Sequence, residues 1–448
     1  MPVSILNMSA YAVADLHENA HDYHIKASTK QSPLACIHCK HDKLDGFGRR
    51  ERMIKDLPIH GKRVGLYIET RRFRCKSCGV TFYESLPEVN DKRLMTNRLV
   101  SWIGHQAVKR TFTSIAEEVG VTEGTVRMVF KDYVSDLEKT VRFETPQWMG
   151  IDEIFLIKPR VVISNIQNNT IVELLPNRNK ESIIRYLRQL PAAEQIQYVA
   201  MDMWAPYRDA VSEVLPGATI VIDKFHVVRM ANDALEKVRK SLREQLTPKQ
   251  RRGLMHDRFV LLKRERELNE KERALLADWT AKYADLGIAY RLKEDFFTIY
   301  ESSQSKEEAL ARFEAWTRNV IPRVEDAFHD LIRAFGNWQP WILNYFDHPV
   351  TNAYTESLNN LIRVMNRLGR GYSFEVLRAK ILFAHGAHKR EHVRPKFERC
   401  REPEDFGGIM FSLSPDLVKD DLPEEDAEII NYGASIDLLV RMIEDGEI

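Results

Sequence analysis

Four of the five cysteines in this chain of 448 residues fall into two short motifs, Cys36-Ile-His-Cys39 and Cys75-Lys-Ser-Cys78. Each motif directs two thiolates toward one point, so the two together can supply the four ligands of a tetrahedral zinc ion. The odd cysteine count and an N-terminus unlike a secretory signal argue against disulfides, and a redox motif would need a single pair in a βαβ unit. Three nearby histidines are alternative ligands: His38, His41 and His60. We therefore predict one structural zinc site, with Cys400 left as a bystander.

The 35 residues between the two motifs predict β-structure, although they exceed the spacing of about 15–20 residues that is usual for such sites. Val64, Leu66 and Ile68 alternate with polar residues, Gly79 allows a tight turn, and residues 81–83 fit a returning strand. Basic residues surround the motifs: Arg49, Arg50, Arg52, Lys62, Arg63, Arg71, Arg72 and Arg74. These features indicate a zinc ribbon with a basic surface.

Two aspartates lie in segments that otherwise predict buried strands. Asp152 interrupts an apolar run that starts at residue 150, and Asp202 lies near the end of another run over 197–204. Aspartate is depleted in strands and burial of an unpaired carboxylate is costly, so a divalent cation would explain both positions. Such cations also promote phosphodiester chemistry. We therefore predict that both aspartates bind metal, although a single aspartate at a strand end is usually a cap or a turn residue.

A third candidate ligand, Glu356, lies in a predicted amphipathic helix over 351–369. An apolar stripe has the spacing i, i+3, i+4, i+7: Leu358, Leu361, Ile362 and Met365. At about 100° per residue a polar face lies on the other side: Glu356, Asn360, Arg363 and Arg367. A carboxylate in line with an amide and two guanidiniums suits a metal ion and phosphates, and an ordinary solvent-exposed face is the alternative.

The segments around these carboxylates alternate between β-type runs and helices. Five strands are predicted, over 150–158, 160–167, 170–176, 197–204 and 218–225. Asn168-Asn169 fits a hairpin turn between the second and third strands. Helices over 179–190 and 205–215 flank the fourth strand. Three antiparallel strands followed by helix, strand, helix and strand are the order of a ribonuclease-H-like fold.

The residues before this sheet predict a DNA-binding motif. A helix is expected over 92–110, after which Ala116, Gly120 and Val126 have the small–glycine–aliphatic spacing of a helix-turn-helix. Thr122 is a suitable N-cap for its second helix. The candidate contacts to bases or phosphates on that helix are Glu123, Thr125, Arg127 and Lys131. An ordinary αα-hairpin is the alternative.

The charge distribution supports a polyanionic partner, although the net charge of the chain is only +1. Residues 401–448 carry 3 basic and 14 acidic side chains, so the remaining 400 residues carry 63 basic and 51 acidic ones, a net charge of +12. Apolar residues make up 44% of the chain, which suits a soluble protein of about three domains. No apolar run reaches the ~18–20 residues of a membrane span, and we expect a cytoplasmic protein.

The order of these motifs resembles that of the transposases of the ISL3 family of bacterial insertion sequences. The shared motifs are the zinc ribbon, the helix-turn-helix, GIDE at 150–153, MDMW at 201–204 followed by Tyr207, DKFH at 223–226 and NAYTESLNN at 352–360. The resemblance extends to about residue 400. These transposases are DDE enzymes of the ribonuclease-H-like superfamily, so the resemblance implies a DNA transposase.

The same resemblance implies roles for individual residues. It makes Asp152, Asp202 and Glu356 the catalytic triad, with spacings of 50 and 154 residues, and favours Asp152 over the adjacent Glu153, which points to the opposite face of the strand. The triad would hold two Mg²⁺ ions about 3.5–4 Å apart, with Mn²⁺ as a substitute. Supporting residues would be Asp223, His226 and Asn360. Further DNA contacts would come from Arg71, Arg72, Arg74, Arg363, Arg367, Arg370 and Arg378.

The second of these spacings is too long for a bare ribonuclease-H fold, so we expect a multidomain α/β protein with an inserted all-α domain. The expected domains are an N-terminal region at 1–90 with the zinc ribbon at 36–83, a helix-turn-helix domain at 91–145, a mixed-sheet catalytic core at 146–226 and 349–400, the helical insertion at 227–348, and an acidic region at 401–448. The protein would bind terminal inverted repeats and target DNA as a homodimer or larger assembly. A non-catalytic DNA-binding regulator and a structure-selective nuclease are the alternatives.

Overall fold

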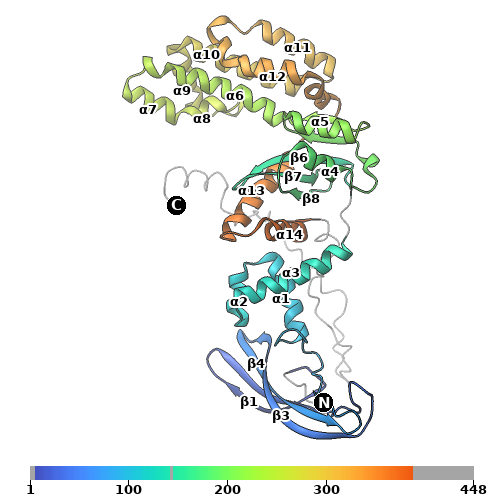
Figure 1. The fold of residues 1–448 in the computed structure, drawn as a ribbon. Helices are drawn as coiled ribbons and strands as arrows, with labels where there is room; N and C mark the ends of the chain where they lie inside the picture. Colours follow the sequence, from blue (N-terminus) through green and yellow to red (C-terminus); the bar gives the residue numbers. More distant parts are fainter. Residues whose placement is uncertain (1–5, 142–144, 387–448) are drawn as a thin grey trace, which may run out of the picture. The chain divides into compact units, whose positions relative to one another are not determined.

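The structure is a computed structural model that describes residues 6–141 and 145–386 (Figure 1). Cys400 and the acidic region predicted at 401–448 lie outside the described residues. Within those two ranges, no helix combines the length and the apolar character that crossing a membrane requires.

The N-terminal part is a five-stranded sheet with the order β1-β2-β4-β3 and with β5 paired to β4. Its strands are β1 (Tyr11–Glu18), β2 (Asp22–Thr29), β3 (Leu44–Ile59), β4 (Lys62–Cys75) and β5 (Thr81–Tyr83). Ile25, Ile54 and Leu66 are fully buried in its core. The predicted returning strand is confirmed as β5. The β1–β2 hairpin had no counterpart in the sequence prediction, because β1 exposes seven of its eight residues and lacks an apolar pattern.

Three helices follow the sheet: α1 (Asn97–Lys109), α2 (Phe112–Val119) and α3 (Glu123–Thr140). Gly120 ends α2 with a φ of 67°, a left-handed conformation that favours glycine. Ala116 and Val126 are buried where the helices cross, and the Thr122 side chain caps α3, as a helix-turn-helix requires. The first helix begins later than predicted, because Thr96 is its N-cap.

The second sheet is mixed, with the order β10-β9-β6-β7-β8. Its strands are β6 (Trp148–Phe155), β7 (Pro159–Asn165), β8 (Thr170–Leu175), β9 (Tyr198–Met201) and β10 (Thr219–Ile222). The strands β6, β7 and β8 are antiparallel, whereas β9 and β10 run parallel to β6. Helices α4 (Lys180–Leu187) and α5 (Ala205–Val214) lie on either side of β9 in the sequence, and a short 3₁₀ helix spans Ala193–Gln195. This sheet agrees with the ribonuclease-H-like prediction.

Between β10 and α13 the described elements are all helices. They are α6 (Lys224–Ser241), α7 (Pro248–His256), α8 (Arg258–Leu262), α9 (Glu270–Lys282), α10 (Ala284–Ser302), α11 (Lys306–Arg318) and α12 (Pro322–Asp347), with 3₁₀ turns at Leu242–Gln245 and Glu265–Glu267. The last of them returns to the sheet, where the Asn344 side-chain amide donates to the Ile220 carbonyl at 2.8 Å. The chain then enters α13 (Ala353–Leu368) and α14 (Phe374–His385).

Helix α14 packs against the helix-turn-helix through a buried lysine. The Lys380 ammonium, on a side chain only 2% exposed, donates to the carbonyl oxygens of Ala107 and Arg110 at the C-terminal end of α1. It also lies 4.6 Å from the ring centre of Phe112 and 5.0 Å from that of Tyr372. Burial lowers the pKa of Lys380 to about 7. This lysine, together with the apolar residues Ala379 and Phe383, therefore joins α14 to the helix-turn-helix.

This lowered pKa predicts a pH-dependent contribution to stability. Between pH 7 and about 10.5 the lysine is protonated in the unfolded chain but largely neutral in the folded one, so the free energy of unfolding rises with pH. Relative to Lys380→Met, the wild-type protein should gain up to about 1.4 kcal/mol per pH unit in that window. Urea unfolding of both proteins from pH 7 to pH 9.5 tests this, and parallel stability curves would contradict it.

Candidate active site and metal centre

Four segments bring the predicted catalytic residues together. Asp152 lies on β6 and Asp202 directly follows β9, and these strands are parallel neighbours with Ile151 opposite Met201. His226 lies in the first turn of α6 and Glu356 in the first turn of α13. Ligand atoms of Asp152, Asp202 and His226 all lie within 4.8 Å of one another, and so do those of Asp223, His226 and Glu356. His226 thus belongs to both groups.

Asp152 is held in a buried position by two hydrogen bonds. Its side chain is 4% exposed, Oδ2 accepts from the Asn359 side-chain amide at 2.7 Å, and Oδ1 accepts from the Glu153 backbone N–H at 2.7 Å. Burial and the negative charge of Asp202 raise the pKa of Asp152 to about 7. The site therefore disfavours two negative charges in the absence of a compensating cation.

His226 supplies a compensating positive charge. Its Nδ1 lies 2.9 Å from Asp202 Oδ1 and 3.7 Å from Asp223 Oδ2. Burial alone would lower the pKa of His226, but interaction with these two carboxylates raises it to about 10, so the imidazole is charged at neutral pH. Asp223 is fully buried and caps α6 through the backbone N–H of Phe225.

The chemistry of this group fits a divalent cation. Asp202 Oδ1 and Asp223 Oδ2 are buried oxygens without a hydrogen-bond partner, although His226 Nδ1 lies 2.9 Å from the first and 3.7 Å from the second. Magnesium prefers carboxylate oxygen ligands, and an ion would satisfy such oxygens. Asp152 and Asp202 belong to the first group and the exposed Glu356 to the second, and these three carboxylates are the candidate ligands that the sequence predicted.

Glu153, the rival of Asp152, has a different environment. Its carboxylate forms an ion pair with Arg178, and the Arg178 guanidinium lies 4.6 Å from the ring centre of Trp204. Trp204 is 39% exposed, whereas Tyr207 is fully buried. A carboxylate already paired with an arginine is a poor candidate for a metal ligand.

Helix α13 places its polar residues differently from the sequence prediction. Asn360 is exposed and accepts a hydrogen bond from Arg363 at 2.9 Å, whereas Asn359 is the residue that contacts Asp152. The one-residue difference rotates the amide by about 100°, from the solvent side toward the sheet. The sequence analysis did not single out Asn359, although its position three residues after Glu356 could have suggested it. Arg367 and Arg370 are exposed.

Arg378, another expected DNA contact, is committed to protein contacts. Its guanidinium binds both carboxylate oxygens of Glu173, at 2.7 and 2.6 Å, and also lies 3.2 Å from a carboxylate oxygen of Glu138. This bidentate pairing ties α14 to β8 and leaves little of the side chain for a phosphate.

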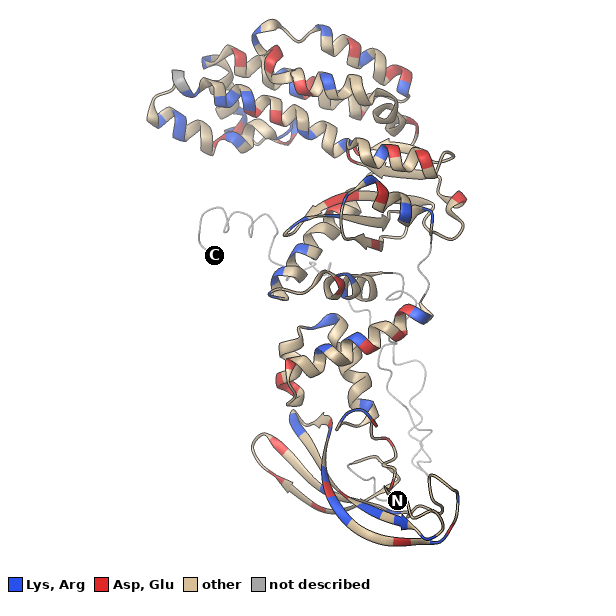
Figure 2. Cartoon of the chain, in the orientation of Figure 1, with Lys and Arg blue, Asp and Glu red and all other residues tan. Residues whose placement is uncertain are grey.

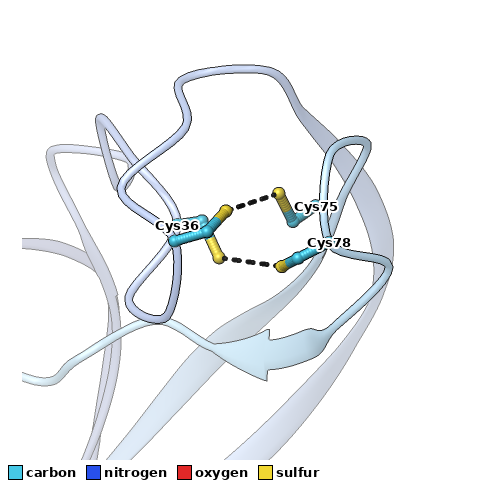
Figure 3. Close-up of side chains that lie close together, drawn as sticks. Cys36, Cys75 and Cys78 are labelled. Atoms are coloured by element: carbon cyan, nitrogen blue, oxygen red, sulfur yellow. Dashed lines mark hydrogen bonds between the residues drawn. The ribbon is translucent and has the colours of Figure 1, made fainter.

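The four predicted zinc ligands meet between the two cysteine loops (Figure 3). The sulfur atoms of Cys36 and Cys78 are 3.8 Å apart, and those of Cys39 and Cys75 are 3.5 Å apart. A tetrahedral site with Zn–S bonds of about 2.3 Å has sulfur–sulfur edges of about 3.8 Å, whereas a disulfide is about 2.05 Å long. Backbone N–H groups of Cys39 and His38 help lower the pKa of Cys36 to about 7, which favours the thiolate. The arrangement therefore suits zinc.

The alternative histidine ligands lie in other contacts. His60 Nδ1 is 3.3 Å from the Tyr23 hydroxyl, and His41 Nδ1 accepts from the Lys43 backbone N–H at 3.1 Å. In the described ranges, the metal-compatible group at these loops consists of the four cysteines alone.

The arginines of the zinc ribbon fall into two groups, those that pair with a carboxylate and those that lie against aromatic rings. Arg71 is partly buried and binds Glu84 at 2.7 Å and the Thr29 hydroxyl at 2.7 Å, which makes it a weaker candidate for the predicted DNA contact. By contrast, Arg72 lies between the rings of Phe47 and Tyr83, at 5.3 and 5.7 Å. Figure 2 shows basic residues along β3 and β4.

Two more arginines join the arrangement around Arg72. Arg74 lies 5.9 Å from the ring centre of Phe47, and Arg52 lies 5.6 Å from that of Tyr83. Within the described part of the chain, no ion pair involves Arg52, Arg72 or Arg74. We call Arg52, Arg72, Arg74, Phe47 and Tyr83 the arginine–aromatic row. Its guanidiniums lie against aromatic rings, and Arg72 also donates to the Thr81 hydroxyl at 3.0 Å. Without a carboxylate partner among the described residues, they can still bind an anion.

The candidate recognition helix α3 exposes part of its predicted contact set. Arg127 and Lys131 are exposed, and Arg127 forms an i, i+4 ion pair with Glu123 at 2.7 Å. The Thr125 hydroxyl lies 2.9 Å from that of Thr122 at the start of the helix, which commits it to the cap. Arg127 and Lys131 are therefore the better placed of the predicted contacts on α3.

Comparison with known proteins gives a consistent result along the chain. Residues 149–381 match a family model of ISL3 DDE transposases. Residues 32–78 match a model of the zinc finger of transposases IS204, IS1001, IS1096 and IS1165. Residues 84–134 match a model of the helix-turn-helix domain of transposase family ISL3. The transposase for insertion sequence element IS1001 of Bordetella parapertussis is 25% identical over 330 residues, which cover 72% of this chain and 81% of that protein. The transposase for IS1557 of Mycobacterium tuberculosis is 27% identical over 305 residues, or 61% of this chain and 67% of that protein.

The cysteine geometry predicts one zinc ion per chain. A Cys75→Ser/Cys78→Ser variant should lose this zinc and should become sensitive to protease between residues 36 and 83, because metal binding and folding of the module are coupled. Metal analysis and limited proteolysis of the purified proteins measure both effects. Cys400→Ser is the matched control and should keep its zinc; unchanged zinc in the double variant would contradict the assignment.

Proposed function

This chain belongs to the ISL3 family of transposases, and we propose that it binds the terminal inverted repeats of its own insertion sequence and cleaves and joins DNA strands there. The observation that carries the proposal is that Asp152 and Asp202 lie close to His226 in one group of possible metal ligands and Glu356 lies close to it in a second group. A buried oxygen of Asp202 and one of Asp223 lack hydrogen-bond partners there. Such a group costs stability unless a cation binds it, and a cation at this position suits phosphodiester chemistry.

Asp152, Asp202 and Glu356 would hold two Mg²⁺ ions, for which Mn²⁺ can substitute. When bound, such ions activate the attacking water or 3′-hydroxyl and stabilise the departing oxygen. The chain's own contribution is to position the ligands. Asn359 fixes the orientation of Asp152, and the charged His226 limits repulsion between the carboxylates before an ion arrives.

DNA recognition would be divided between two surfaces. Helix α3 would enter the major groove with Arg127 and Lys131 on its exposed side, as the second helix of a helix-turn-helix does. The arginine–aromatic row would bind backbone phosphates, because guanidiniums favour phosphate oxygens and contacts to the backbone carry no sequence information. Base contacts from α3 and phosphate contacts from the arginine–aromatic row would together bind an inverted repeat.

The first prediction from this function concerns the triad. Asp202→Asn and Glu356→Gln remove one charge at nearly constant shape, so each variant should fold and should bind a terminal-repeat duplex like the wild type. Cleavage in Mg²⁺ should fall by more than about 100-fold, the upper end for changes in groups that only support a metal ligand. Nicking of a labelled duplex and a gel shift on the same preparation measure the two properties.

Glu153→Gln is the matched control for these variants, because Glu153 neighbours Asp152 but pairs with Arg178. Its effect on cleavage should be far smaller. If Asp202→Asn or Glu356→Gln cuts like the wild type, the catalytic assignment is wrong. If the wild type binds its repeats but never cuts in Mg²⁺ or Mn²⁺, the chain acts as a DNA-binding regulator.

The second prediction concerns the two DNA surfaces. Arg72→Gln/Arg74→Gln should weaken binding to specific and random duplexes alike and reduce the slope of log affinity against log salt by about 2. Arg127→Ala should instead lower discrimination between repeat and random DNA by about 1–3 kcal/mol if the guanidinium contacts a base. The control is Arg49→Gln, because Arg49 already pairs with Glu69 at 3.1 Å. Equal salt slopes in the double variant and the control would remove the row from the interface.

A further inference from the structure

The start of α13 is tied to the sheet by a chain of buried polar side chains that includes none of the proposed metal ligands. Ser164 on β7, Asn352 at the N-cap of α13 and Thr355 in its first turn are all fully buried. Buried polar groups are costly unless they are hydrogen-bonded, so a cluster of three calls for a structural account.

The direction of each hydrogen bond in this chain can be assigned. The Thr355 hydroxyl donates to Asn352 Oδ1, an oxygen that can only accept. The Ser164 hydroxyl, 2.6 Å from Thr355 Oγ1, must therefore donate to Thr355. The Asn352 side-chain amide then donates to the backbone carbonyl of Ile151 at 3.2 Å. The chain of bonds runs from β7 through α13 to β6.

Asn352 makes this contact in place of its usual one. An asparagine at an N-cap commonly accepts a backbone N–H of the first turn, which stabilises the helix by about 1 kcal/mol. Here the side chain of Asn352 makes no such cap bond. Its amide reaches the neighbouring strand instead, so this residue stabilises the position of the helix rather than its end.

Gly150 provides the space for this arrangement. A Cβ atom at this position would lie 2.5 Å from Ser164 Oγ and 2.6 Å from Thr355 Oγ1, and closer still to Asn352 Oδ1. Distances below 3.0 Å require something to move, and all three neighbours are fixed by hydrogen bonds. We call Gly150, Ser164, Asn352 and Thr355 the α13 seat.

We propose that the α13 seat sets the position of Glu356 relative to Asp152, and so determines the affinity of the site for its metal ions; this rests on the function proposed above. The bonded groups are direct chain neighbours of the two carboxylates, since Ile151 precedes Asp152 and Thr355 precedes Glu356. The bond from Asn352 to Ile151 joins residues 201 positions apart. Side chains of the seat are thus positioning residues for a divalent-cation site.

The test compares three variants of graded severity. Thr355→Val keeps the shape but removes the hydroxyl, Thr355→Ser keeps the hydroxyl, and Ser164→Ala removes only the first donor. Mn²⁺ binding to the DNA-free protein, measured by calorimetry, should weaken about 10- to 100-fold in Thr355→Val, as is typical when groups that orient metal ligands are lost. Ser164→Ala should be weakened less, and Thr355→Ser should bind like the wild type.

A second measurement uses hydrogen exchange of the backbone amides in the first turn of α13. Protection there should fall in Thr355→Val and return in Thr355→Ser. The control is Thr317→Val in α11, which removes a hydroxyl that bonds only its own helix, at the Phe313 carbonyl. This control should leave Mn²⁺ affinity unchanged and shows what the loss of a helical hydroxyl does by itself.

The outcomes separate the seat from the proposed reaction. If Thr355→Ser is as weak as Thr355→Val, or if Thr355→Val and Ser164→Ala both bind Mn²⁺ like the wild type, the seat does not position the ligands. If the wild type binds Mn²⁺ and the variants lose affinity in the expected order, but no DNA is cut, the proposed reaction is wrong. The positioning role of the α13 seat is then still supported. If Thr355→Val does not fold, Ser164→Ala decides, through its Mn²⁺ affinity and through hydrogen exchange of the same α13 amides.

Discussion

The concentration of negative charge around His226, where Asp152 and Asp223 are buried and Glu356 is exposed, is the constraint on which the rest of the structure depends. Asp152, Asp202, Asp223 and Glu356 gather around His226, and charged carboxylates this close repel one another and lose solvation. One imidazolium offsets only part of that charge. Hydrogen bonds from Asn359 and the Glu153 N–H hold Asp152, and the Phe225 N–H holds Asp223. A divalent cation would offset more of the charge than the imidazolium does.

The helical insertion has a place in this constraint, since it separates Asp202 from Glu356 in the sequence by 154 residues. The insertion begins with α6, which carries His226 and is capped by the buried Asp223 directly after β10. It ends with α12, which packs on β10 and α6 and bonds to Ile220 through Asn344. Both ends of the insertion are thus fixed to the sheet. Despite the length of the insertion, α13 therefore packs next to Asp152.

The N-terminal sheet is held together, and joined to the rest of the described chain, by different contacts. A small sheet with few buried residues gains order where four cysteines can share a metal ion. That sheet is joined to α1 by the buried Asp56, which accepts from Thr96 at 2.6 Å and also pairs with Arg98. Lys380 then joins α1 to α14. Polar links of this kind connect the DNA-binding elements to the part of the chain that holds the carboxylates.

Local patterns in the sequence were sufficient for much of this fold. The two cysteine motifs, the spacing of Ala116, Gly120 and Val126, and the short apolar runs of the second sheet depend on residues close together in the chain, whose geometry follows from backbone periodicity. Asp152 and Asp202 could be proposed because they interrupt such runs, whereas Glu356 was added from the polar face of its helix and from the resemblance to ISL3 transposases. The residues expected to bind DNA could be named only by type and neighbourhood.

Only the tertiary structure decided which side of each element faces which partner. In the folded chain Arg71 pairs with Glu84, and Asn359 contacts Asp152 where Asn360 does not. His226 lies among the carboxylates. It also joined Asn352 and Thr355 to strands some 200 residues earlier in the chain. A rotation of about 100° per helical residue makes such choices sensitive to one position, and no local pattern encodes contacts across that distance.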